Sequence, residues 1–109
     1  MNAPVHETCI ATPLRRLHAR RWPAQAAADA RTPIVLLHDS LGCTQLWRDF
    51  PEALARATGH PVISYDRLGF GQSDAHPGVL GVDFVASEAQ TSFAAVLQAF
   101  ALDRFMVFG

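Results

Sequence analysis

Three short, largely apolar runs mark where buried strands are expected. They are Ile34–Leu37, Val62–Tyr65 and Phe105–Phe108, and none of them alternates regularly between apolar and polar positions. Strands that are covered on both faces, as in a parallel sheet, have this pattern. The sequence therefore predicts three strands of a parallel sheet, each ending at a polar residue or a glycine.

In the two stretches between these runs, the apolar residues recur at the intervals of a helix. In the first, Asp49 and Gly59 stand where a helix can begin and end, and the apolar positions are Trp47, Phe50, Leu54 and Ala57. In the second, Asp83 is a candidate N-cap, and the apolar stripe consists of Ala89, Phe93, Val96, Leu97 and Phe100. We expect helices near 45–58 and 83–101. Strands and helices that alternate in this way predict an α/β fold with a doubly wound, mostly parallel sheet.

The N-terminal region is less regular. Residues 15–22 alternate, with Leu17 and Ala19 on one side, which predicts a strand with a polar face at the edge of the sheet. Residues 1–13 have no periodicity and are expected to be a loose arm. The stretch 23–32 fits a weak helix, a turn, or the second strand of an edge hairpin near Ala28–Thr32. The sheet then has about five strands, and residues 14–109 form one domain.

Composition narrows the class of protein. Half of the residues are hydrophobic and 17% are charged, so the chain can bury a core and is not disordered. Nine basic and ten acidic residues give a formal charge of −1, which offers no electrostatic footprint for nucleic acid or an anionic membrane. No apolar run approaches the roughly 20 residues of a membrane-spanning helix.

The positions of the cysteine and histidine residues indicate neither a disulfide scaffold nor a metal site. Cys9 and Cys43 form neither a CxxC pair nor a zinc spacing, and two thiols do not indicate a secreted disulfide scaffold. The first twenty residues contain Glu7 and several arginines and lack an apolar core, so no signal peptide is visible. We expect a cytoplasmic protein that needs no cofactor or metal, since no metal-ligand spacing links His6, His18, His60 and His76.

Two loops that follow predicted strands carry the most information, because ligands of open α/β sheets bind at the carboxyl ends of the strands. The first is His38-Asp-Ser-Leu-Gly42, and the second is Asp66-Arg-Leu-Gly-Phe-Gly-Gln-Ser-Asp74. Together with Trp47 and the apolar run ending at Gly109, they resemble the α/β-hydrolase superfamily. Its members have an His-Gly-x loop after the third strand and an Asp-x-Arg-Gly-x-Gly-x-Ser loop after the fourth. The resemblance covers roughly residues 15–109 and implies an α/β-hydrolase fold that is incomplete in this chain.

The resemblance implies a role for the first loop. It places the backbone N–H of Ser40 in an oxyanion hole, with His38, Asp39, Leu41 and Gly42 as the supporting loop. Asp39 stands where the family usually has glycine, which sets a carboxylate beside the developing negative charge. Alternatively, Asp39 caps the turn that leads into the following helix.

The second loop is interpreted as structural. Asp66 can accept hydrogen bonds from the N–H groups of Leu68 and Gly69. Arg67 can bridge to a neighbouring carboxylate. Gly69 and Gly71 supply unusual backbone angles.

The nucleophile implied by the resemblance is not in the chain. Phe105–Phe108 resembles the family's fifth strand and Gly109 the first glycine of the Gly-x-Ser-x-Gly elbow, so the nucleophile is expected just after Gly109, with the acid and the histidine later. Gly71-Gln-Ser73 lacks the second glycine, and Ser73 is interpreted as a loop-capping hydroxyl. Cys43 is interpreted as a small buried residue. We expect no catalytic residue within this chain, which would be truncated before the nucleophile and inactive alone.

Three functions follow from these residues. The first is a serine-type α/β hydrolase that, in the intact family, cleaves ester, C–C or related bonds of a small-molecule substrate. The second is a non-catalytic fragment that associates with a complementary C-terminal chain. The third is a small flavodoxin-like or nucleotide-binding domain, although Asp74 stands where a dinucleotide motif needs glycine. In addition, the uncharged run Phe105–Phe108 is expected to leave an open sheet edge through which the chain self-associates.

Overall fold

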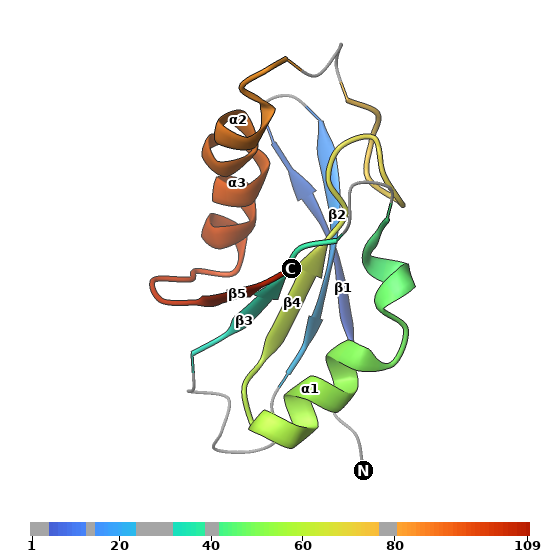
Figure 1. Cartoon of the computed structure of the whole chain (residues 1–109), viewed down its shortest axis with the longest axis vertical. Helices are drawn as coiled ribbons and strands as arrows, with labels where there is room; N and C mark the ends of the chain where they lie inside the picture. Colours follow the sequence, from blue (N-terminus) through green and yellow to red (C-terminus); the bar gives the residue numbers. More distant parts are fainter. Residues whose placement is uncertain (1–4, 13–14, 24–31, 39–41, 77–80) are drawn as a thin grey trace.

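The computed structural model describes residues 5–12, 15–23, 32–38, 42–76 and 81–109. Their strands form a five-stranded sheet with the order β1-β2-β4-β3-β5 (Figure 1). The strands are His6–Ala11 (β1), Arg16–Trp22 (β2), Ile34–Leu36 (β3), Val62–Tyr65 (β4) and Met106–Phe108 (β5). The helical elements are the 3-10 turn Thr44–Trp47 (η2) and the α-helices Phe50–Thr58 (α1), Phe84–Gln90 (α2) and Ser92–Ala99 (α3). Within the described ranges, no helix has the length and apolar character needed to cross a membrane.

The strand directions confirm the predicted mostly parallel sheet. Strand β2 is antiparallel to both of its neighbours, β1 and β4, whereas β3 is parallel to both β4 and β5. Four of the five strands therefore point the same way and only β2 is reversed. The parallel pairs bring the carboxyl ends of β3, β4 and β5 to one edge of the molecule, where both candidate loops begin.

The structure corrects two expectations for the N-terminal region. Within residues 1–13, expected to be a loose arm, His6–Ala11 forms β1 and pairs with β2 along its length. Its only buried hydrophobic residue is Ile10, so the sequence carries no periodic signal for this strand. Strand β2 lies between β1 and β4, not at the sheet edge. The alternatives for 23–32 fall almost entirely outside the described residues.

Two hydrophobic layers cover the central strands, because successive residues of a strand face opposite sides of a sheet. One layer includes Ala55 of α1 and consists of Trp22, Ile34, Leu36, Ala55 and Val62. The other includes Val96 of α3 and consists of Ile10, Leu17, Ala19, Ile63, Tyr65, Leu68 and Val96. Val62 and Ile63 are both completely buried, and burial of a side chain of this size contributes about 1.5–3 kcal/mol. The predicted two-sided burial of β3 and β4 is thereby confirmed.

Strand β5 is different, since it is the last strand of the sheet and pairs with β3 alone among the described strands. All three of its residues are exposed.

The helix expected near 45–58 is divided in two. Arg48 has a positive φ of 53°, which separates η2 from α1. Asp49 occupies the N-cap position of α1 without a side-chain capping hydrogen bond. Gly59 ends the helix as predicted, with φ 73° and an N–H that donates to the carbonyl of Ala55 at 2.9 Å.

The helix expected near 83–101 is also divided, at Thr91 (φ −113°, ψ −88°). Both the N–H and the hydroxyl of Thr91 donate to the carbonyl of Ser87, at 2.9 and 2.7 Å. A threonine hydroxyl that bonds back to the fourth carbonyl before it favours a bend in a helix. Asp83 precedes α2, again without a side-chain capping bond.

Candidate functional site

A cavity of about 330 Å³ lies at the carboxyl ends of β3 and β5. It is lined by His38, Gly42, Cys43, Leu46, Trp47, Phe108 and Gly109. Residues from the predicted first loop thus lie beside the end of the last strand, as the resemblance implies. Asp39, Ser40 and Leu41 of that loop are outside the described residues, and so is the proposed cap at Asp39.

Trp47 and Phe108 line this cavity, and Phe50 packs against both of them. The rings of Trp47 and Phe50 are stacked with centroids 5.5 Å apart, and the Phe108 ring lies 5.7 Å from Phe50 and 6.2 Å from Trp47. The indole Nε1 of Trp47 is buried, and no described residue accepts a hydrogen bond from it. This cluster joins the end of β5 to η2 and the first turn of α1.

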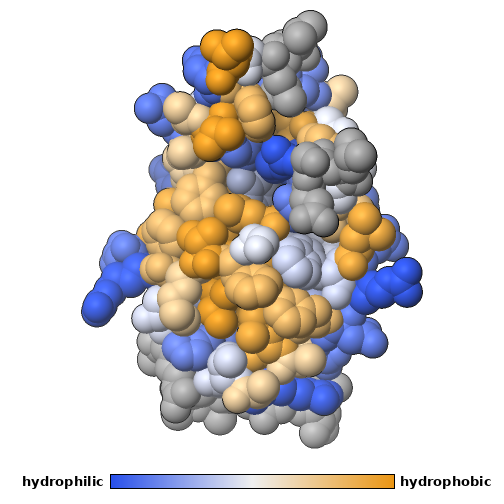
Figure 2. Space-filling view, in the orientation of Figure 1, coloured by the Kyte–Doolittle hydropathy of each residue, from blue (hydrophilic) through white to orange (hydrophobic). Residues whose placement is uncertain are grey.

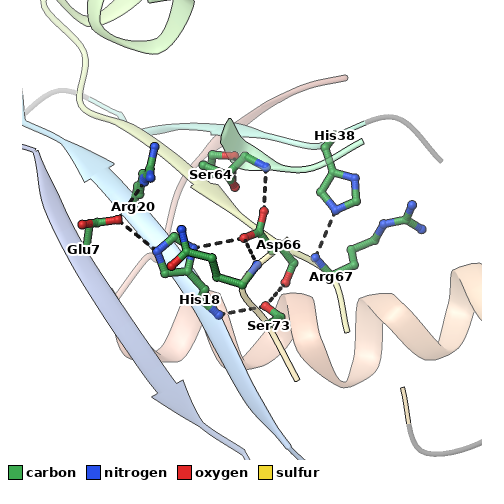
Figure 3. Close-up of polar contacts among 10 residues, drawn as sticks. Glu7, His18, Arg20, His38, Ser64, Asp66, Arg67 and Ser73 are labelled. Atoms are coloured by element: carbon green, nitrogen blue, oxygen red, sulfur yellow. Dashed lines mark hydrogen bonds and ion pairs between the residues drawn. The ribbon is translucent and has the colours of Figure 1, made fainter. Parts of the chain in front are cut away.

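Asp66, at the end of β4, is the centre of the polar network beside the cavity (Figure 3). Its Oδ1 accepts the backbone N–H of Thr44 at 2.6 Å, and its Oδ2 accepts the backbone N–H of Gln72 at 3.0 Å. Oδ2 also lies 3.1 Å from Nδ1 of His18. Asp66 therefore ties the start of η2, the second loop and β2 together.

These partners differ from the expected ones. Asp66 was expected to accept hydrogen bonds from Leu68 and Gly69, but its backbone donors are Thr44 and Gln72. The N–H of Gly69 donates instead to the carbonyl of Asp74, at 2.8 Å. The loop makes a wider turn than the local sequence suggests, so that later N–H groups reach the carboxylate.

The environment of Asp66 favours its ionised form. The residue is only 2% exposed, and this burial by itself raises the pKa of the carboxyl group. The hydrogen bonds from Gln72, Thr44 and His18 lower it, and the net pKa lies below the usual value. The carboxylate is thus a buried charge whose stability depends on these donors.

A chain of polar contacts continues from Asp66 across β2 to β1 (Figure 3). The Nε2 atom of His18 lies 3.2 Å from Oε1 of Glu7, and the same oxygen accepts a hydrogen bond from Nε of Arg20 at 3.0 Å. Hydrogen bonding to His18 and Arg20 lowers the pKa of Glu7. His18 therefore lies between two carboxylates, one buried and one at the surface.

His38 supports the second loop. Its Nε2 accepts the backbone N–H of Arg67 at 3.0 Å, and its ring lies 5.2 Å from that of Phe70. The Arg67 guanidinium carbon lies 4.8 Å from the centre of the Phe70 ring, a cation–π arrangement that the sequence analysis did not anticipate. The histidine at the end of β3 thus holds the loop at the end of β4.

Glycines and a serine fix the second loop around Asp66. Gly69 and Gly71 both have positive φ, 89° and 51°. A Cβ on Gly71 would lie 2.4 Å from Cγ of Asp66, so only glycine fits there. The Ser73 hydroxyl donates to the carbonyl of Asp66 at 2.5 Å and accepts the N–H of His18 at 2.8 Å, as expected for a loop-capping serine.

Several residues of this network are not predictable from the sequence. Thr44 is 2% exposed, and its hydroxyl lies 2.9 Å from that of Ser64. Thr44 is 22 residues from Asp66 and His18 is 48 residues from it, so no local spacing reveals either contact. The one available signal is the position of His18 on the polar side of an alternating strand.

A second cavity, of about 390 Å³, lies on the α2 side of the sheet. At its wall the Tyr65 hydroxyl donates to Oε2 of Glu88 at 2.5 Å. Burial and this hydrogen bond raise the pKa of Tyr65 far above its usual value. The remaining lining is mostly apolar and includes Leu37, Phe84, Val85, Ala89, Phe93 and Val107.

Comparison with known proteins gives concordant matches. Residues 32–109 match the family described as alpha/beta hydrolase fold. The chain is 45% identical over 42 residues to a proline iminopeptidase of Levilactobacillus brevis, a match that covers 38% of this chain and 14% of that protein.

Solved structures extend the likeness over nearly the whole chain. A CIB-like hydrolase of Thermoplasma acidophilum superposes with a TM-score of 0.76 at 21% identity, covering 95% of this chain and 49% of that one. A proline iminopeptidase of Mycobacterium smegmatis superposes with a TM-score of 0.70 at 25% identity, covering 94% and 34%. The chain thus spans less than half the length of each of these relatives.

Proposed function

Because this chain belongs to the alpha/beta hydrolase fold family, we propose that it carries the oxyanion-loop part of a serine-hydrolase active site. In this proposal the backbone N–H of Ser40 stabilises negative charge that develops on the substrate carbonyl oxygen. The nucleophile belongs to an elbow that begins at Gly109. The bond cleaved is an ester, amide or related bond of a small molecule.

One observation carries the proposal: Gly42 of the first loop and the adjacent Cys43 line the same cavity as Phe108 and Gly109 at the end of β5. A hydrolase needs its oxyanion donors within hydrogen-bonding distance of the oxygen formed when the nucleophile attacks. The anchoring of Thr44 to the buried Asp66 carboxylate supports a rigid loop of this kind. Preorganised donors are what such a site requires.

The likeness to proline iminopeptidases favours one substrate class within this proposal, a prolyl peptide or prolyl amide. The aromatic side chains of Trp47 and Phe108 in the cavity lining support it, because a pyrrolidine ring is compact and apolar. A cytoplasmic location is part of the proposal, since Cys9 and Cys43 are both free thiols.

We propose further that the chain is inactive by itself. The Ser73 hydroxyl donates a hydrogen bond to the carbonyl oxygen of Asp66, which is not a base. A serine nucleophile needs a neighbouring base to accept its proton. The isolated chain should therefore hydrolyse p-nitrophenyl acetate and proline p-nitroanilide no faster than buffer. Turnover that disappears in Ser73→Ala would contradict this and locate a nucleophile within the chain.

A chimera tests the active-site role directly. Residues 32–109 would replace the matching segment of a proline iminopeptidase, and hydrolysis of proline p-nitroanilide would be measured. Activity in the chimera supports the proposal. A folded chimera without activity on prolyl and ester substrates would refute the role of the first loop, and activity on esters alone would refute the prolyl substrate class.

A further inference from the structure

The first loop is attached on both sides to consecutive residues at the end of β4. At its start, Nε2 of His38 accepts the backbone N–H of Arg67 at 3.0 Å. Just after it, the backbone N–H of Thr44 donates to Oδ1 of Asp66 at 2.6 Å. These two contacts bracket the segment 39–43, which contains Ser40. The orientation of the Asp66 carboxylate therefore bears on where this segment lies.

The other oxygen of that carboxylate is held from β2. Oδ2 of Asp66 accepts the backbone N–H of Gln72 at 3.0 Å and lies 3.1 Å from Nδ1 of His18. An ionised carboxylate accepts hydrogen bonds and cannot donate them, so Nδ1 carries the proton of this contact. The side chains of His18 and Asp66 are only 12% and 3% exposed. Water therefore has little access to replace this donor.

The backbone of His18 is bonded to the same loop. Its N–H donates to the hydroxyl of Ser73 at 2.8 Å, and its carbonyl accepts the N–H of Asp66 at 2.9 Å. Figure 2 shows apolar side chains gathered across the middle of the molecule, over the region of β5, and such groups donate no hydrogen bonds. Within the described residues, polar support for the first loop thus comes from β4, the second loop and β2.

We propose that His18 is a positioning residue for the oxyanion loop. Its Nδ1–H orients the Asp66 carboxylate, the opposite oxygen of which holds Thr44, and the Ser40 N–H is placed through this anchor. His18 acts through Asp66 and touches no substrate. The proposal rests on the proposed function, because the loop that His18 supports is the one assigned to the oxyanion hole.

The two ring nitrogens of His18 have unequal roles in this proposal (Figure 3). Nε2 lies 3.2 Å from Oε1 of Glu7, whose side chain is 56% exposed and which also accepts Nε of Arg20 at 3.0 Å. Water can replace Nε2 at this surface carboxylate, whereas the buried Asp66 has no such substitute. Loss of the Nδ1 donor should therefore displace the first loop, and loss of the Nε2 contact should not.

Amide side chains separate the two nitrogens experimentally. In His18→Asn the amide nitrogen takes the place of Nδ1, and in His18→Gln it takes the place of Nε2. Hydrogen exchange of the Thr44 amide reports its bond to Asp66 without any substrate. We expect the protection of this amide to fall about tenfold or more in His18→Gln and to change little in His18→Asn. Glu7→Gln is the matched control and should also change it little.

The amide of Ile34 is the internal reference, because it donates to the carbonyl of Pro61 at 2.8 Å, away from this network. A general loss of stability lowers the protection of both amides together. Displacement of the first loop lowers the protection of Thr44 alone. The ratio of the two protection factors therefore separates a positioning role from a merely structural one.

Catalysis is measured in a chimera in which residues 5–109 replace the matching segment of a proline iminopeptidase, so that β1 and β2 are included. A displaced oxyanion donor weakens binding of the transition state more than binding of the substrate. His18→Gln should therefore lower kcat by about tenfold or more and leave KM nearly unchanged, and His18→Asn should keep most of kcat.

Several results would overturn the proposal. Equal responses of Thr44 and Ile34 in His18→Gln, equal effects of the two amide variants, or an unchanged kcat in His18→Gln each refute it. An inactive wild-type chimera counts against the proposed function, and the Thr44 amide then decides whether His18 holds the loop. If neither amide variant folds, the ¹⁵N signals of the wild-type ring decide: a proton on Nδ1 supports the proposal, and a bare Nδ1 refutes it.

Discussion

Replacing Gly71 with alanine tests whether the second loop is built around the Asp66 carboxylate. The new methyl group would lie 2.4 Å from both Cγ and Oδ2 of Asp66, and the backbone has φ 51°. The left-handed conformation costs alanine about 1–2 kcal/mol. Moving the carboxylate weakens its hydrogen bonds to Thr44 and Gln72, each worth about 1.5–3 kcal/mol for a charged acceptor. We expect Gly71→Ala to lower the free energy of unfolding by about 3–5 kcal/mol in total.

Gly69→Ala is the matched control. Its φ is also positive, at 89°, but a Cβ there meets only His76 atoms at 3.7 Å, which is ordinary contact. This variant should lose only the backbone contribution, about 1–2 kcal/mol. Urea unfolding followed by tryptophan fluorescence measures both values. Equal losses in the two variants would refute the steric argument at Gly71, and so would a Gly71→Ala loss below about 1 kcal/mol.

Three further predictions concern the same loops. Folding lowers the pKa of Asp66, so the ionised carboxylate stabilises the folded chain at pH values above the usual pKa of 3.8. This stability is lost as the pH falls through the lower pKa of the folded chain. Asp66→Asn should therefore be less stable near pH 7 and less sensitive to acid, as measured by urea midpoints at several pH values. Ser73→Ala should cost about 1–2 kcal/mol, from the same unfolding curves, and leave ester hydrolysis at background, whereas an unchanged midpoint would show that its two hydrogen bonds contribute little. In the active chimera, Ser40→Pro should lower kcat/KM by about 10²–10³-fold and Ser40→Ala only slightly, because the donor is the backbone N–H; equal effects would contradict the oxyanion role.

The central strands could be predicted because their residues are both buried and apolar, so the hydrophobic pattern of the sequence matches the structure there. Val62–Tyr65 is buried at every position, and its sequence is correspondingly apolar apart from Ser64. Strand β1 could not be predicted in this way, since pairing with β2 holds a segment in which Ile10 alone is a buried hydrophobic residue. The breaks at Arg48 and Thr91 depend on single backbone angles and a local hydroxyl bond, which hydrophobic periodicity does not encode.

The candidate site was predictable at the level of loops and not of contacts. His38 and Asp66 stand at strand ends, and the parallel sheet brings such ends together. Their partners are selected by tertiary packing: Thr44 reaches Asp66 because η2 follows the first loop, and His18 reaches it because β2 lies next to β4. The sequence therefore identifies these residues individually but does not show that they contact one another.

The strand order also determines how the sheet is assembled while the chain is being synthesised. The β1–β2 hairpin can form as soon as Trp22 has emerged, but β3 borders only β4 and β5, which are both made later. An isolated hairpin is marginally stable in water, so no lasting sheet exists until Tyr65 leaves the ribosome and β4 enters between β2 and β3. During that interval Ile34–Leu36, completely enclosed in the finished molecule apart from a small part of Ile34, remains open to solvent. The nascent chain therefore leaves this strand accessible to chaperones until β4 has been made.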